Sequence, residues 1–206
     1  MKHNGFEYVD LDLPSGTKWA TCNVGANSET DYGLYFAFGE TKGYSGFTDA
    51  KKFNWGDYKF SVNGSNSKFA KYNDTDGKKV LDLCDDAANI HMGGKWHMPT
   101  DEQIRELIKN TENIWVTDYN NSGANGRLFT SKINDEKLFF PACSLLFAEG
   151  YYGLNKSGHF WSSSVDNYCS NCGRDLWFGT VSISTGRENR TCGLCVRGVF
   201  NMFWVK

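Results

Sequence analysis

Proline is scarce in this sequence, and long apolar runs are missing. Only 3 of the 206 residues are proline, and no stretch approaches the roughly 18 apolar residues that a membrane-spanning helix needs. We therefore expect no membrane insertion. The opening residues, Met1 to Gly5, also lack the apolar segment of a secretory signal peptide. The sequence thus predicts a protein that does not use the general secretory route, or one supplied without its leader.

An excess of positive charge is missing as well. Lys and Arg number 22 against 24 for Asp and Glu, which gives a formal net charge of −2 and a pI near 6.1. Proteins that bind nucleic acid or anionic membrane surfaces usually carry a basic excess, because the phosphates they contact are negative. We therefore expect no nucleic-acid partner.

Aromatic residues and glycine, in contrast, are abundant. Phe, Tyr and Trp make up 16% of the chain, Gly occurs 22 times, and the mean hydropathy is −0.52. The 7 Trp, 15 Phe and 10 Tyr residues supply much more buriable surface than a disordered chain has. Many glycines and aromatics with few long helical runs are typical of short strands joined by long loops.

Alternation and turn residues predict strands over most of the chain, and two segments predict helices. The helices are expected at 80–91 and 102–110, the second behind a capping box of Thr100 and Gln103. Residues 42–79 should be irregular but packed, and no repeat or linker divides the chain, so we expect one α+β domain over 1–206. The predicted strands are 7–13, 18–25, 35–39, 114–117, 126–132, 137–141, 159–162, 175–184 and 195–200. Turns at Asn125-Gly126 and Thr185-Gly186 should separate some of them. The predicted core includes Trp19, Trp96, Leu107, Trp161, Leu176 and Phe178.

The seven cysteines allow two interpretations. An odd number gives no fully paired disulfide framework, which favours thiols in a reducing compartment. Cys169, Cys172, Cys192 and Cys195 nevertheless form two C-x2-C pairs, the spacing of a four-thiolate structural zinc site. Against zinc, the second pair lies in an extended segment, where side chains three residues apart point to opposite faces. Free thiols or an adventitious disulfide are the other interpretation.

No motif identifies a catalytic centre. The histidines are His3, His91, His97 and His159, and none stands in a nucleophile or metal motif. The acidic clusters at 74–76 and 82–86 lack the Glu that completes a calcium-binding EF-hand loop. We therefore expect no enzymatic activity and no cofactor.

A binding surface is the remaining possibility. The period of two in residues 175–179 places Leu176 and Phe178 on one side of a strand, and Asp175 and Trp177 on the other, outward side. The flanking segments 167–171 and 187–191 contain the Tyr, Ser, Asn and Arg residues that adaptable binding loops use. Ordinary polar loops of a β-rich domain would have the same composition, so both interpretations stay open from the residues alone.

Several longer motifs resemble a family of gut-bacterial and phage proteins. The first is YVDLDLPSGTKWATCNVGA at 8–26, and others follow in order up to about residue 199. These are YFAFGET (35–41), DDAA (85–88), GKWHMPT (94–100), NGR (125–127), FPA (140–142), WSSS (161–164) and VRGV (196–199). The family is that of the variable proteins diversified by diversity-generating retroelements.

The resemblance implies a C-type-lectin-like fold of the formylglycine-generating-enzyme type, with a hypervariable ligand-binding region at about 145–195. Adenine-directed mutagenesis of Asn-type codons would vary this region and leave scaffold residues such as Trp161, Leu176 and Phe178 unchanged. The variable ligand-binding positions implied are Leu145, Leu146, Phe147, Tyr152, Ser157, His159, Phe160, Asn171, Arg174, Asp175, Trp177, Gly179, Arg187, Asn189 and Thr191. Gly153, Cys169, Cys172 and Cys192 would also vary. Adenine changes in an Asn codon can produce a Cys codon, which accounts for the zinc-like spacing without zinc. They cannot produce a Trp codon, so Trp177 departs from the pattern.

The function implied by the resemblance is binding to a protein or glycan receptor, on a phage tail or at a bacterial cell surface. Two alternatives remain: an enzyme of the formylglycine-generating type that uses a Cys, and a zinc-stabilised interaction domain. The catalytic cysteine arrangement of those enzymes is missing from the sequence, and so are the calcium-binding motifs of sugar-binding lectins. A shared fold therefore carries no enzymatic implication here.

Overall fold

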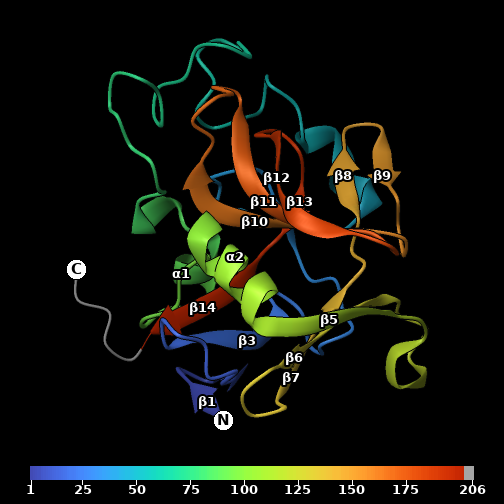
Figure 1. Ribbon diagram of the computed structural model, residues 1–206. Helices are drawn as coiled ribbons and strands as arrows, with labels where there is room; N and C mark the ends of the chain where they lie inside the picture. The colour runs from blue at the N-terminus through green and yellow to red at the C-terminus, as the bar shows by residue number, and fades with distance from the viewer. Residues whose placement is uncertain (202–206) are drawn as a thin grey trace.

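The computed structural model describes residues 1–201, apart from the side chain of Phe47, and shows an α+β arrangement dominated by short strands (Figure 1). The α-helices are α1 (Ala87–Met92) and α2 (Asp101–Asn110), and 3₁₀ turns lie at Phe47–Lys52, Leu83–Asp85 and Tyr119–Asn121. The strands are β1 (Lys2–His3), β2 (Phe6–Val9), β3 (Thr17–Asn23), β4 (Tyr35–Phe36), β5 (Thr111–Val116), β6 (Gly126–Ser131), β7 (Lys137–Pro141), β8 (Leu145–Phe147), β9 (Gly150–Tyr152), β10 (Gly158–Val165), β11 (Cys172–Phe178), β12 (Ile183–Asn189), β13 (Leu194–Cys195) and β14 (Arg197–Asn201). No helix within residues 1–201 combines the length and apolar character that a membrane crossing requires.

Two sheets bring distant parts of the chain together. One has the strand order β1-β2-β3-β14, so the last described strand pairs antiparallel with a strand near the N-terminus. The other has the order β12-β11-β10-β13-β4, in which β13 is parallel to β10 and antiparallel to β4. Strands β5, β6 and β7 form a third, antiparallel sheet, and β8 and β9 form a hairpin. The successive strands β13 and β14 thus connect the two larger sheets (Figure 1).

Helix α2 begins where the sequence predicts and packs against the β10–β12 sheet (Figure 1). The capping box is present: the Gln103 N–H donates to Thr100 Oγ1 at 3.3 Å, and the Thr100 N–H donates to Gln103 Oε1 at 2.9 Å. Ile104 and Leu107 are buried, which confirms the apolar stripe.

Helix α1 is shorter than the predicted helix at 80–91. Asp86 is its N-cap, because the Asp86 carboxylate accepts a hydrogen bond from the Asn89 N–H at 2.9 Å. Upstream of this cap, Val80 instead forms an isolated antiparallel bridge with Ser164 of β10. The helix therefore begins at Ala87, and the prediction for 80–86 is wrong.

The segment 175–184, predicted as one strand, is a hairpin. Strand β11 ends at Phe178 and β12 begins at Ile183, and the Gly179 N–H donates to the Ser182 carbonyl oxygen at 2.9 Å in the turn. The dipeptide Thr185-Gly186, predicted as a turn, lies inside β12, where Gly186 is opposite Asp175. The hairpin of β8 and β9 was not predicted, whereas β7 matches its prediction residue for residue.

The core residues expected from the sequence are all buried. Trp19, Trp96, Leu107, Trp161, Leu176 and Phe178 are each at most 1% exposed. Rings pack edge to face around them, for example Trp161 against Phe38 at 5.3 Å between centroids. The Trp161 Nε1–H donates to the Phe36 carbonyl oxygen at 2.7 Å, so the buried indole has a polar partner.

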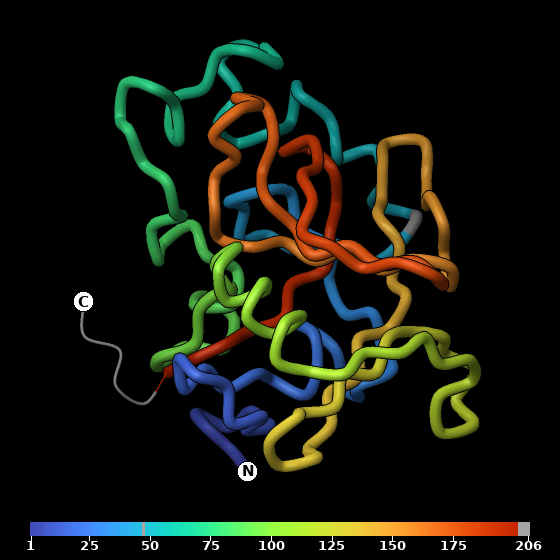
Figure 2. Tube along the Cα trace, in the orientation of Figure 1, coloured from blue at the N-terminus to red at the C-terminus, as the bar shows by residue number. Residues whose placement is uncertain are grey.

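The long segment 42–79 is irregular and packed, as expected. Its side chains Phe53, Tyr58 and Phe60 are buried, and Trp55 packs against the same core. In Figure 2 this segment, cyan to green, loops around the upper part of the molecule beside the orange strands of the C-terminal half. The two regions together form the part of the molecule that carries the candidate site.

Candidate ligand-binding surface

The positions implied as variable fall on β8 to β12 and on the loops that join them. In Figure 2 these segments run from yellow-orange to red and lie together in the upper half of the molecule. Strands β10, β11 and β12 are neighbours in one sheet, with His159 opposite Trp177 and Trp177 opposite Ser184. The structure therefore gathers positions that are up to 46 residues apart in the sequence (145 to 191) into one region.

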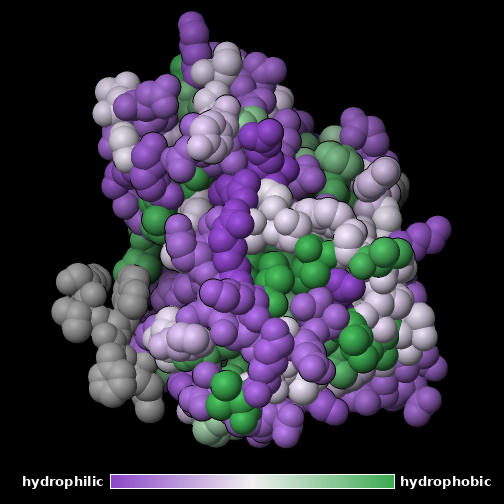
Figure 3. Space-filling view, in the orientation of Figure 1, coloured by the Kyte–Doolittle hydropathy of each residue, from purple (hydrophilic) through white to green (hydrophobic). Residues whose placement is uncertain are grey.

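Twelve of these positions are exposed or half-buried. Tyr152 is 69% exposed and Arg187 is exposed. The half-buried ones are Phe147, Gly153, Ser157, Cys169, Asn171, Cys172, Arg174, Trp177, Gly179 and Asn189. The surface in this view is mostly hydrophilic, with separate apolar patches near β5 and the β11–β12 turn (Figure 3). Exposed apolar residues of those segments are Ile114 and Val181.

Six of the positions named as ligand-binding are buried, and their expected place on an exposed face is corrected here. These are Leu145, Leu146, His159, Phe160, Asp175 and Thr191, each no more than 8% exposed. Cys192, also implied as variable, is 2% exposed. Phe160 lies between the rings of Phe140 and Phe178, with centroids 4.9 and 6.0 Å away. Leu146 exchanges backbone hydrogen bonds of 2.9 and 2.8 Å with Gly193, which holds β8 against the core.

Asp175 shows why the alternation of β11 did not predict exposure. Leu176 and Phe178 share one face of the strand and Asp175 and Trp177 the other, as the period of two requires. The second face is itself covered near Gly173, where an added Cβ would lie 2.3 Å from the Phe38 ring. Asp175 is therefore 1% exposed, and only Trp177, farther along the strand, reaches the surface.

The two segments expected to act as binding loops lie side by side. The Arg190 N–H donates to the Asn171 carbonyl oxygen at 2.9 Å. Arg187 Nη1 is 3.7 Å from Asp166 Oδ1, and Tyr168 between them in sequence is 92% exposed. Residues 187–189 are the end of β12 and not a loop, and Arg190 and Thr191 are buried. The edge of the surface is therefore formed by 167–171 and 187–189.

A polar cavity of about 350 Å³ opens beside these segments, and Arg174 reaches into its wall. The guanidinium of Arg174 contacts Asp101 Oδ1 at 3.1 Å and Asp166 Oδ2 at 3.3 Å, and donates to Thr185 Oγ1 at 3.1 Å. Asp166 Oδ1 also accepts from the N–H groups of Tyr168 and Cys169 at 2.9 and 2.8 Å. These bonds fix the start of the loop, so the cavity has a charged and preorganised wall.

A second group of titratable residues lies on the covered face of the sheet. His159 Nδ1 is 3.3 Å from Asp175 Oδ2 and 4.0 Å from Glu188 Oε1. Burial raises the pKa of Asp175, and the hydrogen bond and charge of His159 offset this only in part. Burial and the charge of Asp175 also raise the pKa of Glu188. Glu188 was not among the predicted site residues, because its position opposite Gly173 depends on the hairpin that the sequence did not reveal.

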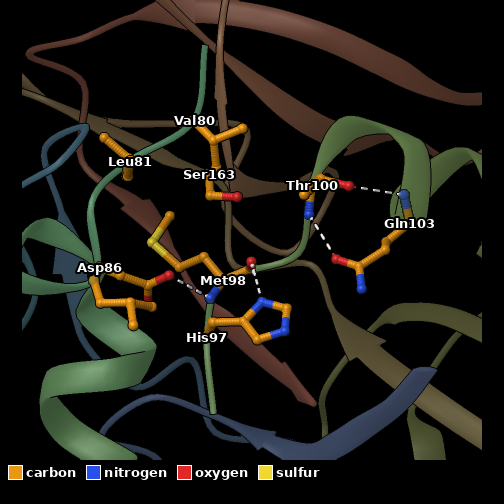
Figure 4. A pocket seen from close by; sticks show the side chains of 9 residues that line it. Val80, Leu81, Asp86, His97, Met98, Thr100, Gln103 and Ser163 are labelled. Atoms are coloured by element: carbon orange, nitrogen blue, oxygen red, sulfur yellow. Dashed lines mark hydrogen bonds between the residues drawn. The ribbon is translucent and has the colours of Figure 1, made fainter. Parts of the chain in front are cut away.

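A further cavity, of about 270 Å³, lies beside the start of α2 (Figure 4). Asp86 accepts from the Met98 N–H at 2.8 Å, and His97 Nδ1 is 2.9 Å from the Met98 carbonyl oxygen. Burial raises the pKa of Asp86 to about 6. Figure 4 shows the hydrogen bonds of Asp86 and His97 to the Met98 backbone beside the cavity, and the two hydrogen bonds between Thr100 and Gln103. These contacts fix the turn between α1 and α2.

The cysteines do not form the four-thiolate site. Cys169 and Cys172 form a disulfide with their Cα atoms 5.3 Å apart, so these two sulfur atoms are joined to each other. Cys192 and Cys195 are buried, and burial raises the pKa of both thiols well above the usual value. The preference for thiols throughout is corrected for this pair, and the alternative interpretation, free thiols or an adventitious disulfide, agrees with the five remaining free cysteines and the one disulfide. A raised thiol pKa is the opposite of what a nucleophilic cysteine needs.

Comparison of the chain with protein-family models, with curated proteins and with solved structures gives no match.

Proposed function

We propose that this protein binds a protein or glycan receptor through the surface formed by β8–β12 and the segments 167–171 and 187–191. In this proposal the fold is C-type-lectin-like, residues 145–195 are a hypervariable region diversified by a retroelement, and the molecule works on a phage tail or at a bacterial cell surface.

The observation that carries the proposal is the contact between the segment before β11 and the end of β12. The Asn171–Arg190 hydrogen bond continues the β11–β12 pairing beyond Cys172 and Asn189, and it holds residues 167–171 beside the end of β12. Tyr168 and Arg187 extend from this edge into solvent. Tyr and Arg are the residue types that most often dominate the affinity of interfaces.

The scaffold beneath this edge is independent of the exposed side chains. Trp161, Leu176 and Phe178 are buried within β10 and β11, and they pack against residues outside the variable region such as Phe38 and Trp115. Exposed positions on the same strands can therefore change without loss of the core, which is what a diversified binding surface requires.

The alternatives have less support from the geometry. A cysteine enzyme would need an accessible thiol of lowered pKa, and within the proposed surface the Cys192 thiol is buried with a raised pKa, as is the Cys195 thiol that follows it. The exposed free cysteine, Cys84, lies outside this surface. A four-thiolate zinc domain would need Cys169 and Cys172 as thiolates, and here they form a disulfide.

A panel of purified bacterial surface glycans and surface proteins, immobilised as an array, tests the proposal. We expect saturable binding to at least one class, weakened at least about tenfold by Tyr168→Ala and by Arg187→Ala, as for residues at the centre of an interface. Ile133→Ala is the matched control, because Ile133 is 68% exposed between β6 and β7, outside the proposed surface. Equal loss in all three variants, or no binding to any class, would count against this surface as the binding site.

A further inference from the structure

His159, Asp175 and Glu188 bring three potential metal ligands together from three adjacent strands. One ligand atom from each, an imidazole nitrogen or a carboxylate oxygen, lies within 4.8 Å of the other two. His159 Nδ1 is 3.3 Å from Asp175 Oδ2 and 4.0 Å from Glu188 Oε1. Ligands around one ion with bonds of about 2.0–2.2 Å are separated by roughly 3–4 Å, so small side-chain shifts would complete the geometry.

One oxygen of the buried Asp175 carboxylate accepts no hydrogen bond from the described residues. The Asp175 side chain is 1% exposed, and Oδ1 is the oxygen without a hydrogen-bond partner among those residues. Gly186 leaves the space beside Oδ1 open, because an added Cβ there would lie only 2.7 Å from it. A buried carboxylate oxygen without a donor is costly, and a cation at this position would remove that cost.

Charge balance supports a divalent ion. The carboxylates of Asp175 and Glu188 carry two negative charges, and an imidazole ligand from His159 carries no charge. A divalent ion bound to all three would therefore make the site neutral. The side chain of Glu188 is 30% exposed, which leaves one side of the group open to solvent and to a further ligand. Three protein ligands with an open position are the usual arrangement of a reactive or ligand-accepting transition-metal site.

We propose that His159, Asp175 and Glu188 bind one divalent transition-metal ion, with Zn²⁺ as the representative, leaving at least one coordination position for an oxygen or nitrogen of a bound molecule. This inference does not rest on the proposed receptor binding. The other acidic group with this spacing, Asp82, Cys84 and Asp85, is a weaker candidate. Lys59, Lys71 and Lys78 already neutralise its carboxylates.

The test is a titration of the full chain, first stripped with a chelator, using Zn²⁺ by calorimetry and Co²⁺ by visible absorption. We expect one equivalent of each to bind, Zn²⁺ to raise the melting temperature, and the Co²⁺ complex to lack a thiolate-to-cobalt charge-transfer band. Asp175→Asn and Glu188→Gln should each weaken binding at least about tenfold, as loss of a ligand does. Cys192→Ser is the matched control and should bind as the wild type does, because Cys192 lies close to the group but is not one of its ligands.

Two outcomes would overturn the proposal. One is a wild-type protein that binds neither ion saturably. The other is binding that survives Glu188→Gln, or that shows a thiolate band and disappears in Cys192→Ser. Because Glu188 is partly exposed, Glu188→Gln keeps the test decisive even where Asp175→Asn impairs folding.

Discussion

Trp177 and Phe178 are neighbours in β11 but lie on opposite faces of its sheet. The Phe178 side chain is fully buried near Phe160 and Trp115, whereas Trp177 is half-buried beside Ser184 of β12. Phe178→Ala should lower the free energy of unfolding by about 3–5 kcal/mol, because it leaves a cavity in the core. Trp177→Ala should cost about 1 kcal/mol. Urea unfolding of both variants measures the difference, and equal losses would contradict the assignment of faces.

Arg197 of β14 is a buried cation that hydrogen-bonds to β3, near the N-terminus. Its guanidinium donates to Asn23 Oδ1 at 2.8 Å and to the carbonyl oxygens of Ala20 and Thr21, and it lies 4.4 Å from the Phe140 ring centroid. Arg197→Met should lower the free energy of unfolding by about 3–5 kcal/mol, since it leaves buried acceptors unpaired.

The control for that substitution is Arg187→Met, at an exposed guanidinium. It should change the unfolding free energy by no more than about 0.5 kcal/mol. A loss below about 1 kcal/mol for Arg197→Met would mean that these buried contacts contribute little to the fold.

Protonation of Asp85 in acid should lower the free energy of unfolding. Burial alone would raise its pKa, but hydrogen bonds from Lys59, Lys71 and Tyr72 outweigh burial and lower the pKa to about 2. The pKa of an unfolded Asp is about 3.9, so ionised Asp85 stabilises the fold above that pH, and the stabilisation disappears as the pH falls through 2. Allowing for solvent screening of the partly exposed lysines, the contribution is about 1–2 kcal/mol.

The measurement is the free energy of unfolding from pH 6 to pH 2 for the wild type and Asp85→Asn. The difference between them should be largest near pH 6 and should shrink towards pH 2. Asp74→Asn, at an exposed acid in the neighbouring turn, should follow the wild-type profile. A constant difference across the range would show that the charge of Asp85 does not contribute.

The features that local chemistry determines were predictable from the sequence. The capping box at Thr100 and the burial of the large aromatic residues follow from hydrogen-bonding groups and apolar surface that any fold must satisfy. The β11–β12 turn was missed because Gly179 to Ser182 carries weaker turn signals than the Thr185-Gly186 pair inside β12. The start of α1 was missed because it depends on the pairing of Val80 with Ser164, a contact distant in sequence.

The site was predictable only in part, for a related reason. Alternation assigned Asp175 and Trp177 to one face correctly, but it does not reveal what covers that face. Phe38 covers it, from the turn after β4, more than a hundred residues away in the sequence. The same covering produces the buried group of His159, Asp175 and Glu188, which no local motif indicates.

The measurement that tests the central claim most directly is sequencing of the DNA that encodes residues 145–195, together with its genomic surroundings. We expect a near-identical repeat nearby that differs from the coding sequence only at adenines. Changes at both adenines of an Asn codon leave its final pyrimidine, so Arg174 and Arg187 should be encoded by CGC or CGT. The codons of Trp161, Leu176 and Phe178 should be identical in the two copies. The absence of such a repeat, or differences spread over all four bases and over scaffold codons, would contradict the account.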